Sequence, residues 1–364
     1  MEAKQQLKSL TPYKPGKNVE DVRKELGLKE IVKLASNENP FGPPPAARQA
    51  IEREMSELAV YPDGYAAVLR EKTAQFTGVD REKLVFGDGS DEVIQMICRA
   101  YLTPDSNTVM PTPTFPQYKH NAVVEGAEIR EVPVREGRHD FDKMAEAVDE
   151  QTKIVWLCMI NNPSGEYIRE SELAAFMGNL PSDVLVVCDE AYYEYVVAED
   201  YPDTLSFLKQ YPNLIVTRTF SKAYGLAALR VGYGIAHPEI TSALESIRQP
   251  FNTSRIGQFA AAAALDDQDF IKECRDVNRE CLDLFYNFCK EYSLSYYPSQ
   301  GNFILIDFNR SGDEVFDYLL RHGYIVRSGT VLGYPTSVRI TIGSEKQTKD
   351  IIECLSEWLK PSMH

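Results

Sequence analysis

The sequence of 364 residues lacks the features that mark several common classes of protein. Its seven cysteines form no C-x-x-C pair and its five histidines show no metal-ligand spacing, so we expect reduced thiols and no metal site. No apolar run approaches the roughly 18 residues that cross a bilayer. The segment Met1–Leu10 is too polar for a secretory signal. We therefore expect a cytoplasmic protein without a membrane segment.

Positively charged residues are also outnumbered by negatively charged ones. The chain carries 39 lysines and arginines against 54 aspartates and glutamates, which gives a formal net charge of −15. This balance opposes the broad positive field that non-specific binding to nucleic acid or to an anionic membrane needs, so we expect neither partner. A local basic pocket for a small anion remains compatible with it, and arginines near other anion-binding signals are therefore candidates.

The composition is otherwise that of a globular protein, with 43% hydrophobic and 26% charged residues. At roughly 100–200 residues per domain, the length fits two or three domains. Between residues 46 and 250, short continuous apolar runs alternate with amphipathic segments. The runs begin at Leu84, Thr108, Ile154, Val184, Leu214 and Val231. This alternation predicts an α/β fold with a mainly parallel sheet flanked by helices.

The two ends of the chain differ from this central region in their sequence pattern. Residues 1–45 are irregular and rich in proline, which favours an extended arm over a packed helix. After residue 250, a long helical pattern over Gly257–Tyr292 is followed by short strands and helices, which indicates a smaller α+β unit. We therefore expect an arm over 1–45 that packs with the small domain as a lid, a large domain over 46–250 and a small domain over 251–364.

Polar residues follow four of the predicted strands, at the edge where a parallel sheet binds its ligands. Gly87–Glu92 can offer backbone amides to a phosphate, although a plain helix cap explains it equally well. Asn162 follows the next of these strands, and Asp189 ends a buried strand, where a carboxylate needs a cation. Lys222 lies among hydroxyl and small apolar residues, which favours the lowered pKa that Schiff-base chemistry needs. Four such strand ends together indicate one ligand site.

The segment Thr219–Ala228, with the sequence TFSKAYGLAA, resembles the cofactor-lysine signature of the fold-type-I aminotransferases, which use pyridoxal 5′-phosphate. Further motifs are similar to those of one branch, the histidinol-phosphate aminotransferase family, nearly from end to end. They are YKPG, LASNENP, YPDG, PTFPQY, DEAY and RITIG, which begin at Tyr13, Leu34, Tyr61, Pro113, Asp189 and Arg339. The resemblance implies a large domain that binds pyridoxal 5′-phosphate around a mainly parallel sheet, with a smaller α+β domain beside it.

The resemblance also implies roles for individual residues. Lys222 is the catalytic residue, which holds the cofactor as a Schiff base and moves a proton. Asp189 pairs with the pyridine nitrogen, while Asn162 and Tyr192 bind the ring oxygen. Phe115 stacks on the ring. The cofactor phosphate is assigned to Ser90, Asp91, Thr219, Ser221 and Arg230, and to Tyr61 of the neighbouring chain in a homodimer with shared active sites.

The implied substrates are a small-molecule amino donor and a 2-oxo acid. Arg339 resembles the arginine that binds the α-carboxylate, with Asn37 nearby. Arg327 and Tyr13 match contacts to the substrate phosphate, although Arg327 could also be a solvated charge at a strand end. The implied reaction is transamination between L-histidinol phosphate and 2-oxoglutarate to imidazole acetol phosphate and L-glutamate, a step of histidine biosynthesis.

Three alternatives stay open. The chain could be an aromatic-amino-acid aminotransferase for phenylalanine and tyrosine, alone or as a second activity, or a threonine-phosphate decarboxylase on the same scaffold. A non-catalytic cofactor-sensing module would need a DNA-binding element, and the arm has neither the length nor the pattern of a helix-turn-helix. The sequence departs from many relatives at Asp88, Ile160, Ser164 and Gly301. Of these, Asp88 adds an acid beside the predicted phosphate loop.

Overall fold

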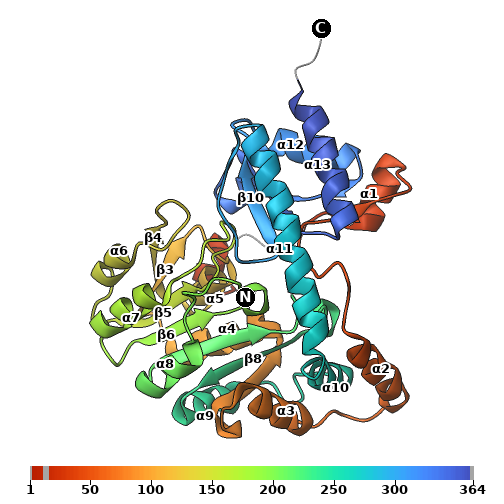
Figure 1. The fold of residues 1–364 in the computed structure, drawn as a ribbon. Helices are drawn as coiled ribbons and strands as arrows, with labels where there is room; N and C mark the ends of the chain where they lie inside the picture. Colours follow the sequence, from red (N-terminus) through yellow and green to blue (C-terminus); the bar gives the residue numbers. More distant parts are fainter. Residues whose placement is uncertain (1, 11–15, 361–364) are drawn as a thin grey trace.

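A computed structural model describes residues 2–10 and 16–360 (Figure 1). Its larger body is built on a seven-stranded sheet with the order β2-β8-β7-β6-β5-β3-β4. The strands are β2 Leu84–Asp88, β3 Asn107–Thr112, β4 Glu128–Pro133, β5 Thr152–Cys158, β6 Leu185–Asp189, β7 Leu214–Thr219 and β8 Val231–Ala236. Only β8 runs antiparallel to its neighbours in this sheet, β2 and β7. The predicted α/β fold with a mainly parallel sheet is confirmed.

The strand that sequence patterns missed is β4, at one edge of this sheet. Its six residues mix charged with apolar side chains, and only Val132 is buried. Continuous apolar runs mark strands that are covered on both faces, and an edge strand does not need such a run. The prediction therefore located the covered strands and overlooked the exposed one.

Helices cover both faces of this sheet, because successive strand residues point to opposite sides. One face packs against α4 Gly89–Tyr101, α5 Gln117–Glu125 and α9 Pro238–Ile247. The opposite face packs against α2 Pro45–Glu54, α3 Ala67–Thr77, α6 Phe141–Glu146, α7 Glu170–Asn179, α8 Thr204–Gln210 and α10 Arg255–Ala264. Short 3-10 turns lie at η1 Gln5–Ser9, η2 Met55–Glu57, η3 Arg81–Lys83, η4 Tyr193–Tyr195, η5 Ala227–Leu229 and η6 Thr330–Leu332.

The smaller body is built on a four-stranded antiparallel sheet with the order β12-β13-β10-β9. Its strands are β9 Ser295–Tyr296, β10 Phe303–Asp307, β12 Arg327–Ser328 and β13 Ser337–Thr341. Helices α11 Gln268–Glu291, α12 Gly312–Arg321 and α13 Glu345–Leu359 enclose a separate apolar core with this sheet. Figure 1 shows the smaller body beside the larger one, with α11 extending between them.

The long helical pattern predicted over Gly257–Tyr292 is two helices. It is broken between α10 and α11 at Leu265, Asp266 and Asp267. Adjacent aspartates disfavour a helix interior and favour its caps, and Asp267 is the N-cap of α11. Helix α10 packs with the larger body through its alanines, although it lies after residue 250. The division into 1–45, 46–250 and 251–364 stays a prediction.

The N-terminal region contains more regular structure than we predicted. Helix α1, Val19–Leu26, begins where the Asn18 side chain accepts a hydrogen bond from the Glu20 amide, and it ends at Gly27. Strand β1, Val32–Lys33, then pairs in parallel with β11, Tyr324–Ile325. The expected irregular arm is therefore wrong for 19–26, because the prolines that break structure only flank this segment. In the described part of the chain, no helix is long and apolar enough to cross a membrane.

Candidate active site

A cavity of about 590 Å³ lies at the carboxyl ends of the parallel strands, where the larger sheet meets β12 and β13. Every described site residue that the sequence predicted lines this cavity, with the exception of Tyr61. The residues are Asn37, Ser90, Asp91, Phe115, Asn162, Asp189, Tyr192, Thr219, Ser221, Lys222, Arg230, Arg327 and Arg339. The predicted contact Tyr13 lies outside the described residues. The cavity therefore joins residues from both bodies and from the N-terminal segment.

Lys222 follows β7 at this edge and reaches the N-terminal segment. Its Nζ donates a hydrogen bond of 3.0 Å to the main-chain oxygen of Ser36. Burial, helped by the positive charge of Arg339, lowers the pKa of the Lys222 amine to about 8. A larger share of such an amine is neutral near pH 7 than of an ordinary lysine, and the neutral form is the nucleophile.

Asp189 ends β6 and is only 4% exposed. Its carboxylate accepts hydrogen bonds from the Tyr118 hydroxyl (2.6 Å) and the Ala191 amide (3.2 Å). Burial nevertheless raises the pKa of Asp189 to about 6, so a cation in the cavity would stabilise its charged form. Sequence reasoning missed Tyr118, although it follows Phe115 by three residues in a quoted motif. The motif is the signal that could have found it, because Tyr118 ends that motif and lies in the first turn of α5.

Tyr192 connects the N-terminal segment with the larger body. Its hydroxyl oxygen accepts hydrogen bonds from Asn37 Nδ2 (2.9 Å) and Asn162 Nδ2 (3.3 Å). Because the oxygen accepts both bonds, the hydroxyl proton can be donated to a ligand. Arg339, on β13, donates to Asn162 Oδ1 (2.5 Å) and to the Ala35 carbonyl (2.7 Å). The amides and the arginine thus form a continuous polar wall.

Asn37 has a left-handed backbone, with a φ of 56°, which asparagine tolerates better than most residues. Two side chains of the smaller body hold it in place, one from β13 and one directly before β10. Its amide donates to Thr341 Oγ1 (2.9 Å), whose hydroxyl donates in turn to Asn37 Oδ1 (2.9 Å). Asn302 Nδ2 donates to the Asn37 carbonyl (3.0 Å). Sequence reasoning did not single out Asn302 or Thr341, because their contact with Asn37 joins distant parts of the chain.

The other end of the cavity is suited to an anion. Arg230 lies at the amino end of β8, the reversed strand, and donates to Ser221 Oγ and Asp91 Oδ2, both at 3.2 Å. The amides of Ser90 and Asp91 lie in the first turn of α4. Gly89 has a φ of +73°, and a Cβ there would lie 2.5 Å from Arg230 Nη2. A helix N-terminus, a hydroxyl and a guanidinium together suit a phosphate.

Tyr61 lies away from the cavity, on the surface. It is 77% exposed and stacks on Phe251 with ring centroids 4.7 Å apart. Leu58, Val60, Tyr61 and Phe251 are all exposed and line one shallow hollow, which we call the Tyr61 patch. Tyr61 therefore lies outside the cavity of its own chain, and its predicted contact with the cofactor phosphate of a neighbouring chain stays a prediction.

These residues fit the cofactor that the sequence resemblance implies. Asp189 is a buried carboxylate suited to a protonated ring nitrogen, and Lys222 is an amine with a lowered pKa. The Arg230 end of the cavity suits the phosphate group, and Phe115 lies on the cavity wall in edge contact with Tyr118. Each part of pyridoxal 5′-phosphate therefore has a chemically matched group in the same cavity.

Residues 29–355 match the family model for aminotransferases of class I and II. Histidinol-phosphate aminotransferases from Geobacillus sp. (strain WCH70) and Bacillus subtilis (strain 168) are 59% and 58% identical over 360 residues. These alignments cover 99% of this chain and 99% and 100% of the relatives. The solved histidinol-phosphate aminotransferase of Sinorhizobium meliloti, in complex with pyridoxal 5′-phosphate, has a TM-score of 0.89 and 28% identity. The alignment covers 98% of this chain and 97% of the Sinorhizobium meliloti chain.

The predicted fold-type-I architecture is confirmed by this structural similarity, and pyridoxal 5′-phosphate is the cofactor. The similarity covers nearly the whole of this chain and of the relatives, so it includes both bodies and the N-terminal segment. The chain therefore belongs to the class I and II aminotransferases and, within them, to the histidinol-phosphate aminotransferase family.

Proposed function

We propose that this enzyme transfers the amino group of L-histidinol phosphate to 2-oxoglutarate, which gives imidazole acetol phosphate and L-glutamate. The observation that carries the proposal is that Arg327 and Arg339 line the same cavity as Lys222. The names of relatives that are 58–59% identical over 360 residues support it. This reaction would place the enzyme in histidine biosynthesis.

The two arginines serve substrates of different shape. L-Histidinol phosphate carries one phosphate and no carboxylate, whereas glutamate and 2-oxoglutarate carry two carboxylates. Arg339 can therefore meet an α-carboxylate only in the glutamate half of the reaction, while Arg327 is assigned to the phosphate in the other half. A guanidinium binds either anion with paired hydrogen bonds, so one cavity can accept both substrates in turn.

Lys222 would carry out the proton transfer. When bound, pyridoxal 5′-phosphate supplies an electron sink that makes the substrate Cα–H acidic. The Lys222 amine, with a pKa near 8, takes that proton as a general base. With the cofactor bound, Asp189 would hold a proton at the ring nitrogen, and the Tyr192 hydroxyl would donate to the ring oxygen. The Ser36 carbonyl accepts a hydrogen bond from the free Lys222 amine and so would orient that amine for the proton transfer.

A homodimer is proposed on the basis of the Tyr61 patch. Its four apolar side chains are 44–77% exposed, and a second copy that covered them would remove this apolar surface from water. In the proposed dimer, Tyr61 is the residue assigned to the cofactor phosphate of the neighbouring chain. A cytoplasmic location is supported by the seven cysteines, all of which are buried free thiols.

An aromatic-amino-acid aminotransferase activity is a second candidate. Val331 and Leu332 line the cavity together with Phe115, so one wall is apolar enough to contact an aromatic ring. Phenylalanine would then present its α-carboxylate to Arg339 and would leave Arg327 without a phosphate to bind.

A half-reaction screen tests both candidates. The cofactor-loaded enzyme is mixed separately with histidinol phosphate, phenylalanine, tyrosine and glutamate, and the loss of visible absorbance is followed. Histidinol phosphate and glutamate should react fastest, and Lys222→Ala should remove both the absorbance and the turnover. A fast reaction with phenylalanine and none with histidinol phosphate would favour the aromatic activity. Full turnover by Lys222→Ala would contradict the assigned catalytic residue.

A further inference from the structure

Glu92 holds the turn that opens α4. One of its carboxylate oxygens, Oε2, accepts a hydrogen bond from the Asp88 amide (2.5 Å) and another from Asn252 Nδ2 (2.7 Å). The first bond closes the loop between Asp88 and Glu92, which contains the amides of Ser90 and Asp91. The second bond comes from a segment more than 150 residues away in the sequence, so the position of this turn depends on Asn252.

Asn252 is fixed on both sides of its amide group. Its Nδ2 also donates to the Phe86 carbonyl on β2 (3.0 Å), and its Oδ1 accepts from Arg248 Nη1 (2.8 Å). Both polar atoms of the side chain are therefore engaged. The amide links the middle of β2, the first turn of α4 and the segment that follows α9.

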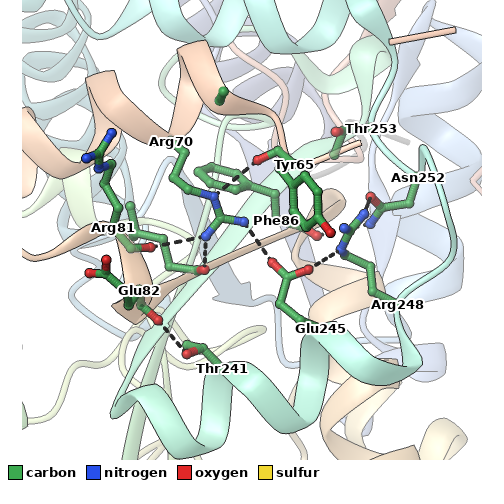
Figure 2. Close-up of polar contacts among 12 residues, drawn as sticks. Tyr65, Arg70, Arg81, Glu82, Phe86, Thr241, Glu245, Arg248, Asn252 and Thr253 are labelled. Carbon is green, nitrogen blue, oxygen red and sulfur yellow. Dashed lines mark hydrogen bonds and ion pairs between the residues drawn. The ribbon is translucent and has the colours of Figure 1, made fainter. Parts of the chain in front are cut away.

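The support continues through a chain of charged side chains (Figure 2). Arg248 Nε donates to Glu245 Oε2, and Arg70 Nη2 donates to Glu245 Oε1, both at 2.7 Å. Arg70 is held in turn by the main-chain oxygens of Tyr65 and Arg81, at 3.1 Å each. Figure 2 shows Arg70, Glu245, Arg248 and Asn252 in succession, so helices α3 and α9 brace the segment that carries Asn252.

The braced segment is under backbone strain. Phe251, directly before Asn252, has a φ of 56°, which is unfavourable for a bulky side chain, and its ring stacks on Tyr61. Strain of this kind persists where the surroundings determine the conformation, and it is concentrated at functional sites. Here the hydrogen bonds of Arg248 and Asn252 hold the residues on either side of Phe251.

We propose that Asn252 is a positioning residue for the cofactor phosphate and acts through Glu92 on the amides of Ser90 and Asp91. Asn252 does not line the cavity that contains Lys222, so it would act only through Glu92. The proposal rests on the placement of the phosphate at the start of α4 in the proposed function. It assigns a task to a side chain that no sequence motif marked, and it explains why a strained segment is braced from two helices.

The test compares two ligands that differ only in the phosphate. Dissociation constants for pyridoxal 5′-phosphate and for pyridoxal are measured on the cofactor-free protein by absorbance titration. Asn252→Leu should weaken the binding of pyridoxal 5′-phosphate by about tenfold or more, as expected for a hydrogen bond to a charged group, and should change pyridoxal binding by less than about twofold. Asn252→Asp keeps the size of the side chain but cannot donate to Glu92, so it should give the same selective loss.

Asn121→Leu is the matched control. Asn121 lines the same polar hollow as Asn252 and Glu92, but its side chain donates to Gln117 within its own helix. This variant should bind both ligands as the wild type does. Equal loss of both ligands in the Asn252 variants would show a merely structural role and overturn the proposal, as would unchanged binding of pyridoxal 5′-phosphate. A wild-type protein without preference for the phosphorylated ligand would instead contradict the placement of the phosphate.

Discussion

Tyr118 donates a hydrogen bond of 2.6 Å to the buried carboxylate of Asp189. The tyrosine is itself fully buried and stacks on Trp156, with ring centroids 4.7 Å apart. Burial and the negative charge of Asp189 raise the pKa of the Tyr118 hydroxyl well above its ordinary value, so it remains a donor throughout the physiological range. Tyr118 therefore holds one oxygen of the Asp189 carboxylate, which is assigned to the ring nitrogen, while the Ala191 amide holds the other.

Replacing Asp189 by asparagine should stabilise the cofactor-free protein at high pH. The folded-state pKa of Asp189 is about 6, against an ordinary value of 3.8. Its contribution to stability is therefore present below about pH 4 and lost as the pH rises through 6. Asp189→Asn should gain up to about 3 kcal/mol at pH 8 and almost nothing at pH 4. Urea unfolding across this range measures the difference, and a gain independent of pH would contradict the assignment. Asp183→Asn, at an exposed site, is the control.

Tyr118→Phe should shift the pH dependence of turnover. The Tyr118 hydrogen bond lowers the pKa of Asp189, so its loss raises that pKa and weakens the hold on a protonated ring nitrogen. We expect the acidic limb of the kcat/KM profile to move up by about one pH unit, which lowers the rate roughly tenfold at pH 5 and about twofold at pH 7. Tyr211→Phe, whose ring packs on Phe207, should leave the profile unchanged. A uniform loss of rate without a shift would mean that Tyr118 only supports packing.

Arg327→Ala should separate the two candidate substrates. Removal of a guanidinium from a phosphate should raise KM for histidinol phosphate by about tenfold to a hundredfold. KM for phenylalanine, which has no phosphate, should change by less than about threefold. Steady-state kinetics with both donors provides the comparison, with Arg321→Ala at the exposed end of α12 as a control. Equal effects on the two donors would remove Arg327 from the proposed phosphate contact.

Tyr61→Ala and Tyr61→Phe should distinguish assembly from cofactor contact. The alanine variant loses the ring that stacks on Phe251 and should weaken self-association, which sedimentation velocity detects. The phenylalanine variant keeps the ring and should remain a dimer, but it should bind pyridoxal 5′-phosphate about threefold to tenfold more weakly because the hydroxyl is absent. If both variants are dimers with wild-type affinity, Tyr61 has no part in the shared site.

Most of the larger body could be predicted from the sequence, because its central strands are covered on both faces and appear as continuous apolar runs. A run such as that beginning at Ile154 can only be a buried element, whereas the edge strand β4 carries no such signal. Helix α1 was overlooked for a different reason. Its eight residues have ordinary capping signals at Asn18 and Gly27, but the prolines on either side dominated the interpretation of the segment.

The candidate site was predictable where strand order alone brings residues together. Asp189 ends β6 and Lys222 follows β7, the parallel neighbour of β6, so their proximity follows from the fold. Arg327 and Arg339 came from family resemblance, since they lie in another sheet. The contacts of Lys222 with Ser36 and of Asn37 with Asn302 join segments from different bodies. No local pattern records which side chains meet across such a distance.

Helix α11 has its two ends in different hydrophobic cores. Near its start, Ile271 packs into the core of the larger body, and farther along Phe285 packs into that of the smaller body. Its 24 residues span about 36 Å without a break. If either core came apart, one end of a continuous helix would lose its packing while the other stayed in place. The helix therefore couples the two bodies during unfolding, and heat should melt them in a single cooperative transition.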